Sequence, residues 1–340
     1  MSTLQETVSD PAAPTTDTPV GKSATLGRAA SLIMLVALLI VPFFVRNFII
    51  FQLTMLLIYG IAVLALNILT GGSGQFSLGQ SAFYAVGAYA AAILIEHGGV
   101  NYALTLPIAG VICFIFGFLF GFPALRLSGI YLALATFALA VAMPQLLKLG
   151  VFEHWTGGVQ GLVVTKPDAP FGLPMSQDMW LYYFTLVVSL LIYLASVNLL
   201  RSRSGRAMMA IRDNEIAAAA MGVDVSMYKT LAFGVSAGIT GVAGALGAIA
   251  VQFVAPDSYT FQLAIALFLG MVVGGVGWLP GSLAGAAFIV FVPNIAEGIS
   301  KGLSGAFFGI LLFVVIYLVP HGARQGAIIA ESLFNKLRRS

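Results

Sequence analysis

The chain has 340 residues, of which 59% are hydrophobic and only 9% are charged, with a formal net charge of +3. A soluble domain carries roughly 25% charged residues, so this chain has too few to cover a water-facing surface. The composition excludes a soluble globular protein, a disordered chain and a barrel of alternating strands, and leaves an all-α polytopic membrane protein.

The first 28 residues are polar and rich in Ser, Thr, Pro and Ala, which predicts a disordered tail. This tail is not a secretory signal, because the apolar stretch after Arg28 is long and a second one follows almost at once. The transmembrane domain is expected over residues 29–320, followed by a second tail over residues 321–340.

Apolar segments predict about ten transmembrane helices. A spanning helix needs about 20 apolar residues, and the uncharged runs at 47–95 and 258–296 are each long enough for two. The predicted spans are residues 29–45, 48–70, 82–96, 103–122, 129–147, 180–200, 230–254, 261–273, 281–297 and 304–320.

Ten spans place both termini on one side, and the basic residues indicate which side. One face of the predicted topology collects all Lys and Arg residues except Arg46, Lys148, Lys166 and Lys301. The positive-inside rule makes that face cytoplasmic, so both tails are expected in the cytoplasm. Two longer loops then result, a periplasmic loop at 148–179 and a cytoplasmic loop at 201–229.

Ionisable residues give little support to coupled transport or to catalysis. No Asp or Glu falls in the middle of a predicted span, which argues against a proton-coupled carrier. The three histidines, His97, His154 and His321, show no metal-ligand spacing, and no catalytic set is clustered. Gly21-Lys22-Ser23 lacks the earlier glycine of a phosphate-binding loop, so we expect no nucleotide site.

The cytoplasmic loop carries the signals of a short surface helix. Asp213 or Asn214 can cap its start, four alanines follow, and Gly222 can end it in the left-handed conformation. The predicted helix has about eight residues and a small-residue face that another protein could approach closely. The alternative is an ordinary amphipathic helix at the membrane surface.

Four glycines between residues 71 and 79 predict a helix break near 71–80. Gln75, Ser77 and Gln80 add uncharged hydrogen-bonding groups there, and a zwitterionic amino acid could be matched by them and by freed backbone groups. The alternative is a cytoplasmic turn that needs glycine only for its geometry.

Other glycines predict two further features. A second glycine cluster at 270–281 is similar to the first and suggests an internal repeat. The GxxxG pairs at 117/121, 234/238, 270/274 and 281/285 predict close helix packing.

Two motifs resemble those of a known family. Ala217, Ala218 and Gly222 keep the spacing of the coupling loop of ABC importer permeases, with Glu215 displaced by the inserted Ile216. Residues 66–83 and 229–246 resemble the signatures of the high-affinity branched-chain amino acid permeases of the LivM type. Gln80 stands where many members have His, and the resemblance covers roughly residues 30–325.

This resemblance implies a permease subunit in the bacterial inner membrane, with both termini cytoplasmic. Its implied partners are a paralogous permease subunit, two cytoplasmic ABC ATPases, a periplasmic substrate-binding protein and membrane lipid, with no nucleic acid. The chain itself is expected to bind no cofactor or metal and not to be an enzyme, since ATP is hydrolysed by the partner subunits. Urea and short-amide permeases share the scaffold and remain an alternative.

Three groups of candidate site residues follow. Those expected to couple to the ATPase are Gly205, Arg206, Arg212, Glu215, Ala217, Ala218 and Gly222. Those expected along the translocation pathway are Gly74, Gln75, Ser77, Gly79 and Gln80. Those expected to dock the binding protein are Trp155, Gly157, Gly158 and Gly161, for which a purely structural loop is the alternative. A gradient-driven carrier or channel and a membrane-embedded enzyme are the rival functions.

Overall fold

The computed structural model describes residue 36 and residues 38–124, 127, 129–169 and 175–299. Residues up to Arg46 form a unit of their own, which contains the 3-10 helix η1 (Val41–Phe43). The predicted tails at 1–28 and 321–340 and the span at 304–320 lie outside the described residues, as do residues 29–35 and 37 of the span at 29–45.

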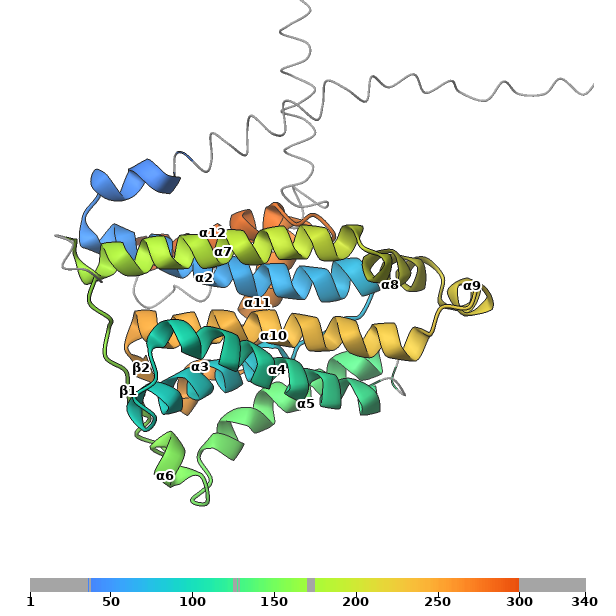
Figure 1. Cartoon of the computed structure of the whole chain (residues 1–340), viewed down its shortest axis with the longest axis horizontal. Helices are drawn as coiled ribbons and strands as arrows, with labels where there is room; N and C mark the ends of the chain where they lie inside the picture. Colours follow the sequence, from blue (N-terminus) through green and yellow to red (C-terminus); the bar gives the residue numbers. More distant parts are fainter. Residues whose placement is uncertain (1–35, 37, 125–126, 128, 170–174, 300–340) are drawn as a thin grey trace, which may run out of the picture. The chain divides into compact units, whose positions relative to one another are not determined.

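The main unit, from Asn47 onward, is almost entirely helical (Figure 1). In chain order its helices and strands are α2 (Asn47–Asn67), the π-helix η2 (Ile68–Gly72), α3 (Gln80–Glu96), α4 (Tyr102–Ala124), α5 (Ile130–Leu147), α6 (Glu153–Thr156), β1 (Leu162–Val163), α7 (Gln177–Arg201), α8 (Arg203–Asp213), α9 (Glu215–Ala220), α10 (Val225–Val251), β2 (Phe253–Val254), η4 (Pro256–Tyr259), α11 (Phe261–Gly274) and α12 (Gly281–Ile299).

Eight of the ten predicted spans coincide with helices of this unit. Within the described residues, six helical segments are both long and apolar enough to cross a membrane, so the protein is a multi-pass membrane protein. Helices α3 and α12 fall short by length or hydropathy. The count of about ten is therefore not reached among the described residues.

Helix α10 lies at the centre, with α2 and α7 on one side and α3 and α4 on the other (Figure 1). Small residues let these helices approach closely, as expected for membrane helices. A Cβ at Gly87 would lie 2.1 Å from the carbonyl oxygen of Gly241, and one at Gly244 would lie 2.0 Å from that of Tyr84. The contact between α3 and α10 therefore depends on glycine.

The predicted role of the GxxxG pairs is confirmed. A Cβ at Gly117 of α4 would lie 2.3 Å from Ala237 of α10, which follows Gly234 by one turn. The two other pairs face each other between α11 and α12. A Cβ at Gly285 would lie 1.9 Å from the carbonyl oxygen of Gly270, and one at Gly281 would be equally close to that of Gly274.

The connecting segments gather at two ends of the main unit (Figure 1). Segments predicted to be periplasmic meet at one end, where β1 pairs with β2 and Lys148 forms an ion pair of 2.5 Å with Asp257. Segments predicted to be cytoplasmic meet at the other, where α8 and α9 lie. The predicted alternation of the spans is consistent with this sorting.

The cytoplasmic loop holds two helices where the sequence predicted one. Ser202 caps α8, which sequence reasoning missed, and the Asn214 side chain caps α9 by accepting a hydrogen bond from the Ala217 amide at 3.0 Å. Helix α9 has six residues rather than the expected eight. The predicted left-handed end at Gly222 is confirmed, with φ of +83°.

Candidate functional site

The predicted helix break is present between α2 and α3. The π-helix η2 follows α2, and residues 74–79 form a non-helical segment before α3 begins at Gln80. From Ser73 onward, buried and exposed residues alternate: Ser73, Gln75 and Ser77 are buried, whereas Gly74 and Phe76 are exposed. The Phe76 side chain is 50% exposed, which the sequence reasoning did not anticipate.

Local hydrogen bonds hold part of this segment. The Ser73 hydroxyl donates to the carbonyl of Leu69 at 2.7 Å, and the Thr70 hydroxyl donates to that of Gln75 at 3.1 Å. The amide of Leu78 donates to the Thr136 hydroxyl of α5 at 2.9 Å. In the part of the chain that the structure describes, the amide and carbonyl of Phe76 make no hydrogen bond.

The segment runs inward along α10 instead of turning back at its end. Gln75 donates to the carbonyl of Lys229, near the start of α10, at 3.1 Å. Gln80 donates to the Ser236 hydroxyl at 2.9 Å and accepts from that of Thr240 at 2.7 Å, near the middle of α10. Seven residues of helix separate Lys229 from Ser236, which corresponds to roughly 10 Å.

The predicted pathway residues therefore have different surroundings within this chain. The side chains of Gln75, Ser77 and Gln80 are buried, and Gln80 belongs to a polar network inside the helix bundle. Gly79 packs against Thr136, whereas Gly74 is on the accessible side of the segment with a φ of +72°.

The second glycine cluster meets this break. Asn67, the last residue of α2, donates to the carbonyls of Gly275 and Trp278, both at 3.2 Å, and accepts from the Gly277 amide at 2.6 Å. A Cβ at Gly71 would lie 2.6 Å from the Gly277 backbone. The only sequence signal for this contact was the similarity of the two glycine clusters.

Helices α8 and α9 present the predicted coupling residues in different ways. Gly205 packs against the end of α7, since a Cβ there would lie 2.3 Å from the Leu199 carbonyl oxygen. Ala217 is exposed but Ala218 faces inward and is buried. The large exposed residues of α9 and its end are Ile216 and Met221, 83% and 85% exposed, which sequence reasoning did not select.

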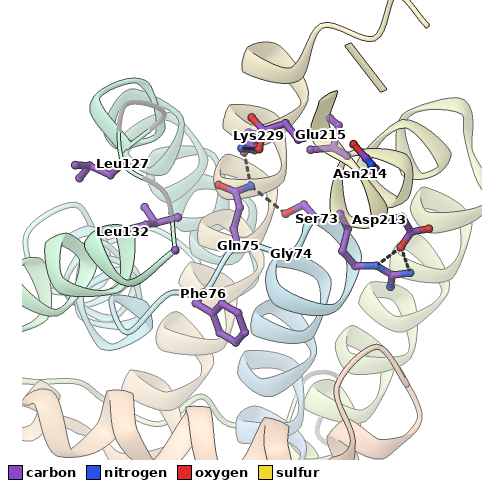
Figure 2. Close-up of a pocket in the computed structure, with 13 residues that line it drawn as sticks. Ser73, Gly74, Gln75, Phe76, Leu127, Leu132, Asp213, Asn214, Glu215 and Lys229 are labelled. Carbon is purple, nitrogen blue, oxygen red and sulfur yellow. Dashed lines mark hydrogen bonds and ion pairs between the residues drawn. The ribbon is translucent and has the colours of Figure 1, made fainter. Parts of the chain in front are cut away.

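Charged residues join this loop to the break, around a pocket of about 250 Å³ (Figure 2). Arg212 donates to the Gly71 carbonyl oxygen at 2.7 Å and to the Asp213 carboxylate at 2.8 and 3.0 Å. Lys229 pairs with Glu215 at 2.6 Å, and Figure 2 shows Gln75 reaching both Ser73 and Lys229. Arg206 instead donates to the Arg201 carbonyl within the loop, at 2.9 Å.

The opposite end carries the residues predicted to dock a binding protein. Trp155 in α6 is 51% exposed, and its ring lies 5.6 Å from those of His97 and His154. Gly157, Gly158 and Gly161 all have positive φ, and a Cβ at Gly161 would lie 2.3 Å from the Val254 carbonyl oxygen. The loop is thus folded onto the end of the bundle with Trp155 accessible. No cluster of metal-ligating side chains occurs among the described residues.

Comparison with known proteins gives consistent matches. Residues 48–319 match the model of the family described as "Branched-chain amino acid transport system / permease component". The chain is 35% identical to the high-affinity branched-chain amino acid transport system permease protein LivM of Salmonella typhimurium and to that of Escherichia coli. Each alignment spans 272 residues, 72% of this chain and 64% of the relative.

A relative of lower identity is named for the import of a different compound. The autoinducer 2 import system permease protein LsrC of Salmonella typhi is 29% identical over 207 residues, which are 58% of this chain and 57% of that protein. The chain thus spans less than two thirds of the length of these relatives. No solved structure matches the chain.

Proposed function

The chain belongs to the family of branched-chain amino acid transport system permease components, and on that premise we propose that it is the permease subunit of an ABC importer for branched-chain or related amino acids. A periplasmic binding protein delivers the substrate, and two cytoplasmic ATPase subunits supply the energy. The observation that carries the proposal is the α8–α9 loop, which exposes a short capped helix and is bonded to the helix break.

Coupling takes place at α9 in this proposal. Ile216 and Met221 project from the chain and present apolar surface to the ATPase, and Ala217 lets the backbone approach it. Glu215 and Gly222 fix the two ends of the helix. Gly205 and Ala218 are buried, and they let the loop pack against α7 and the rest of the bundle. Arg206 and Arg212 hold the loop's own conformation and its contact with the break.

The translocation pathway runs past the accessible side of residues 73–79. Non-helical backbone at membrane depth is tolerated only where it is buried in protein or lines a water-filled cavity. Gly74 and Phe76 are exposed, and the Phe76 peptide groups have no partner among the described residues. This side therefore faces water or the second permease subunit. The buried Gln75, Ser77, Gly79 and Gln80 hold the segment in place.

At the periplasmic end, Trp155 contacts the binding protein. The positive φ angles of Gly157, Gly158 and Gly161 give the loop the fixed turns that hold Trp155 beside the two histidines. We place the chain in a bacterial inner membrane with ten spans, both termini cytoplasmic, and a paralogous permease as its partner in the membrane. The chain binds no cofactor and no nucleic acid.

Other substrates and mechanisms are less well supported. A urea or short-amide permease would use the same scaffold, but the relatives with the higher identity carry branched-chain amino acid names. A gradient-driven carrier generally needs ionisable groups within the membrane. Among the residues whose burial the structure describes, no Asp, Glu, Lys or Arg side chain is buried.

An uptake assay tests the proposal. In a strain lacking the gene, the restored protein should support ATP-dependent uptake of labelled leucine that unlabelled valine inhibits and urea does not. Inhibition by urea alone would assign the short-amide alternative. Uptake that persists when the co-expressed ATPases are inactivated, and collapses with the ion gradient, would overturn the ABC importer assignment.

A further inference from the structure

Arg212 connects two parts of the chain that are far apart in sequence. Its Nη1 donates to the carbonyl oxygen of Gly71, in the π-helix η2, at 2.7 Å. Its Nε and Nη2 donate to the carboxylate of Asp213, at the end of α8. The Asp213 carboxylate thus holds the guanidinium through two of its nitrogens, while the third, Nη1, bonds the helix break at Gly71.

Gly71 offers an acceptor because η2 ends one residue later. The last carbonyls of a helix lack intrahelical partners, and a cation there also interacts favourably with the helix dipole. Gly74 brings α8 close to the same point, since a Cβ there would lie 3.0 Å from Arg212 Cγ. The π-helix η2 stands at the end of α2, directly before the non-helical segment, and π-helical turns are frequent at functional sites.

A displacement at Gly71 cannot stay local. A Cβ at Gly71 would lie 2.6 Å from the Gly277 backbone, and Asn67 bonds the same loop between α11 and α12. A pull on the Gly71 carbonyl therefore acts on both glycine-rich breaks together. Because the backbones at Gly71 and Gly277 are in close contact, a movement of one segment must displace the other.

Helix α9 has a different attachment. Glu215 pairs with Lys229, which is part of α10, so this contact ties α9 to the central helix. Among the described residues, Arg212 makes the only hydrogen bond from α8 or α9 to residues 67–79. Helix α8 thus has one direct polar contact with the break, whereas α9 reaches the break only through Lys229, whose carbonyl accepts from Gln75.

We propose that Arg212 is the positioning residue through which movement of the α8–α9 loop is transmitted to the helix break at residues 71–79. This inference rests on the proposed function, because it assumes that the loop receives the ATPase. Arg212 contacts neither substrate nor nucleotide in this role. Its removal should separate ATP hydrolysis from transport without detaching the ATPase.

The test compares Arg212→Met with Arg212→Lys in the complete importer, reconstituted in vesicles with its ATPases and binding protein. Met keeps the stem that packs on Gly74 but removes every donor. Arg203→Met is the matched control, because Arg203 is exposed on the same helix and its side chain makes no hydrogen bond in the described part of the chain. Leucine uptake and ATP hydrolysis are measured together.

Arg212→Met should lower uptake per ATP by about tenfold, the factor expected for loss of one charge-assisted hydrogen bond, while the ATPases still co-purify. Arg212→Lys should restore part of the ratio, since Lys can still donate to Gly71 but cannot fork to Asp213. Arg203→Met should match the wild type.

A second readout does not depend on transport. Amide hydrogen exchange over residues 72–79 should accelerate in Arg212→Met and stay unchanged in Arg203→Met. Unchanged exchange, or an unchanged uptake per ATP, would overturn the role of Arg212 while leaving the importer assignment intact. Loss of ATPase co-purification in Arg212→Met would also overturn it, because the residue would then serve docking. A wild-type complex with no ATP-driven uptake would count against the proposed function itself.

Discussion

Asn67 and Gly277 are 210 positions apart and are joined by a hydrogen bond of 2.6 Å from the Gly277 amide to the Asn67 side-chain oxygen. The same side chain donates to the carbonyls of Gly275 and Trp278. One buried amide group thus satisfies three backbone groups of the loop between α11 and α12. The two glycine-rich breaks form a single structural unit because of it.

Asn67→Ala should destabilise the protein by about 1–3 kcal/mol, because it removes three hydrogen bonds between α2 and this loop and leaves the Gly277 amide without its acceptor. Thermal unfolding of the purified protein in detergent measures the effect. Asn101→Ala is the control, since the Asn101 side chain accepts a hydrogen bond from the Ala103 amide at an exposed position. Equal losses in the two variants would contradict the structural role of Asn67.

The contact between α3 and α10 gives a second stability prediction. Gly244→Ala would place a Cβ 2.0 Å from the Tyr84 carbonyl oxygen, so the two helices must separate. Overpacking of this kind costs roughly 1–3 kcal/mol. Gly150→Ala is the matched control because a Cβ there meets nothing within 4 Å. Unfolding midpoints that coincide for the two variants would show that the helices can adjust.

Much of the helical framework could be predicted from the sequence, because a span needs only a sufficient apolar length. The break at 71–80 was equally readable, since four glycines make a continuous helix costly. The contact between Asn67 and Gly277 was not readable, because no local pattern specifies a partner 210 residues away. Helix α8 was missed because its charged sequence resembles a solvated loop.

Which side of α9 is exposed could not be predicted from the sequence either. Ala217 and Ala218 are chemically alike, yet one is exposed and the other is buried. In a helix of six residues, the side that faces outward is set by the Asn214 cap and the Glu215–Lys229 pair. The sequence pattern indicated the small residues, whereas Ile216 and Met221 are the large apolar residues that are exposed on α9 and at its end.

The accessible side of the break can be tested by chemical labelling. In a Cys113→Ala background, cysteine at Phe76 should react with a small water-soluble thiol reagent several times faster than cysteine at Gln80. The reason is burial, since the Gln80 side chain is enclosed and bonded between α3 and α10. Leu191, exposed on α7, is a control for apolar surface. Labelling at Phe76 no faster than at Leu191 would remove this segment from the aqueous path.

The periplasmic end yields a prediction about substrate delivery. Trp155→Ala should reduce stimulation of ATP hydrolysis by the loaded binding protein, because Trp155 is accessible to it. Basal hydrolysis should not change, because α6 and α9 lie at different ends of the main unit (Figure 1). Phe253→Ala, at the same end but outside the ring cluster of His97, His154 and Trp155, is the control. Unchanged stimulation in Trp155→Ala would favour a purely structural loop.

The last prediction concerns the surface that receives the ATPase. Ile216 and Met221 are exposed at the start and end of α9, so replacing both with Ser removes apolar contact area without leaving a cavity in the chain. Burial of one such side chain is worth about 1.5–3 kcal/mol, which predicts at least a tenfold loss of affinity for the ATPase from the double change. Co-purification and ATPase titration measure this loss, and the unfolding midpoint of the permease should not move. Met227→Ser is the matched control, because Met227 is exposed at the same end of the unit but lies on α10. If the double variant retains full affinity while Met227→Ser loses it, the ATPase contacts α10 and not α9.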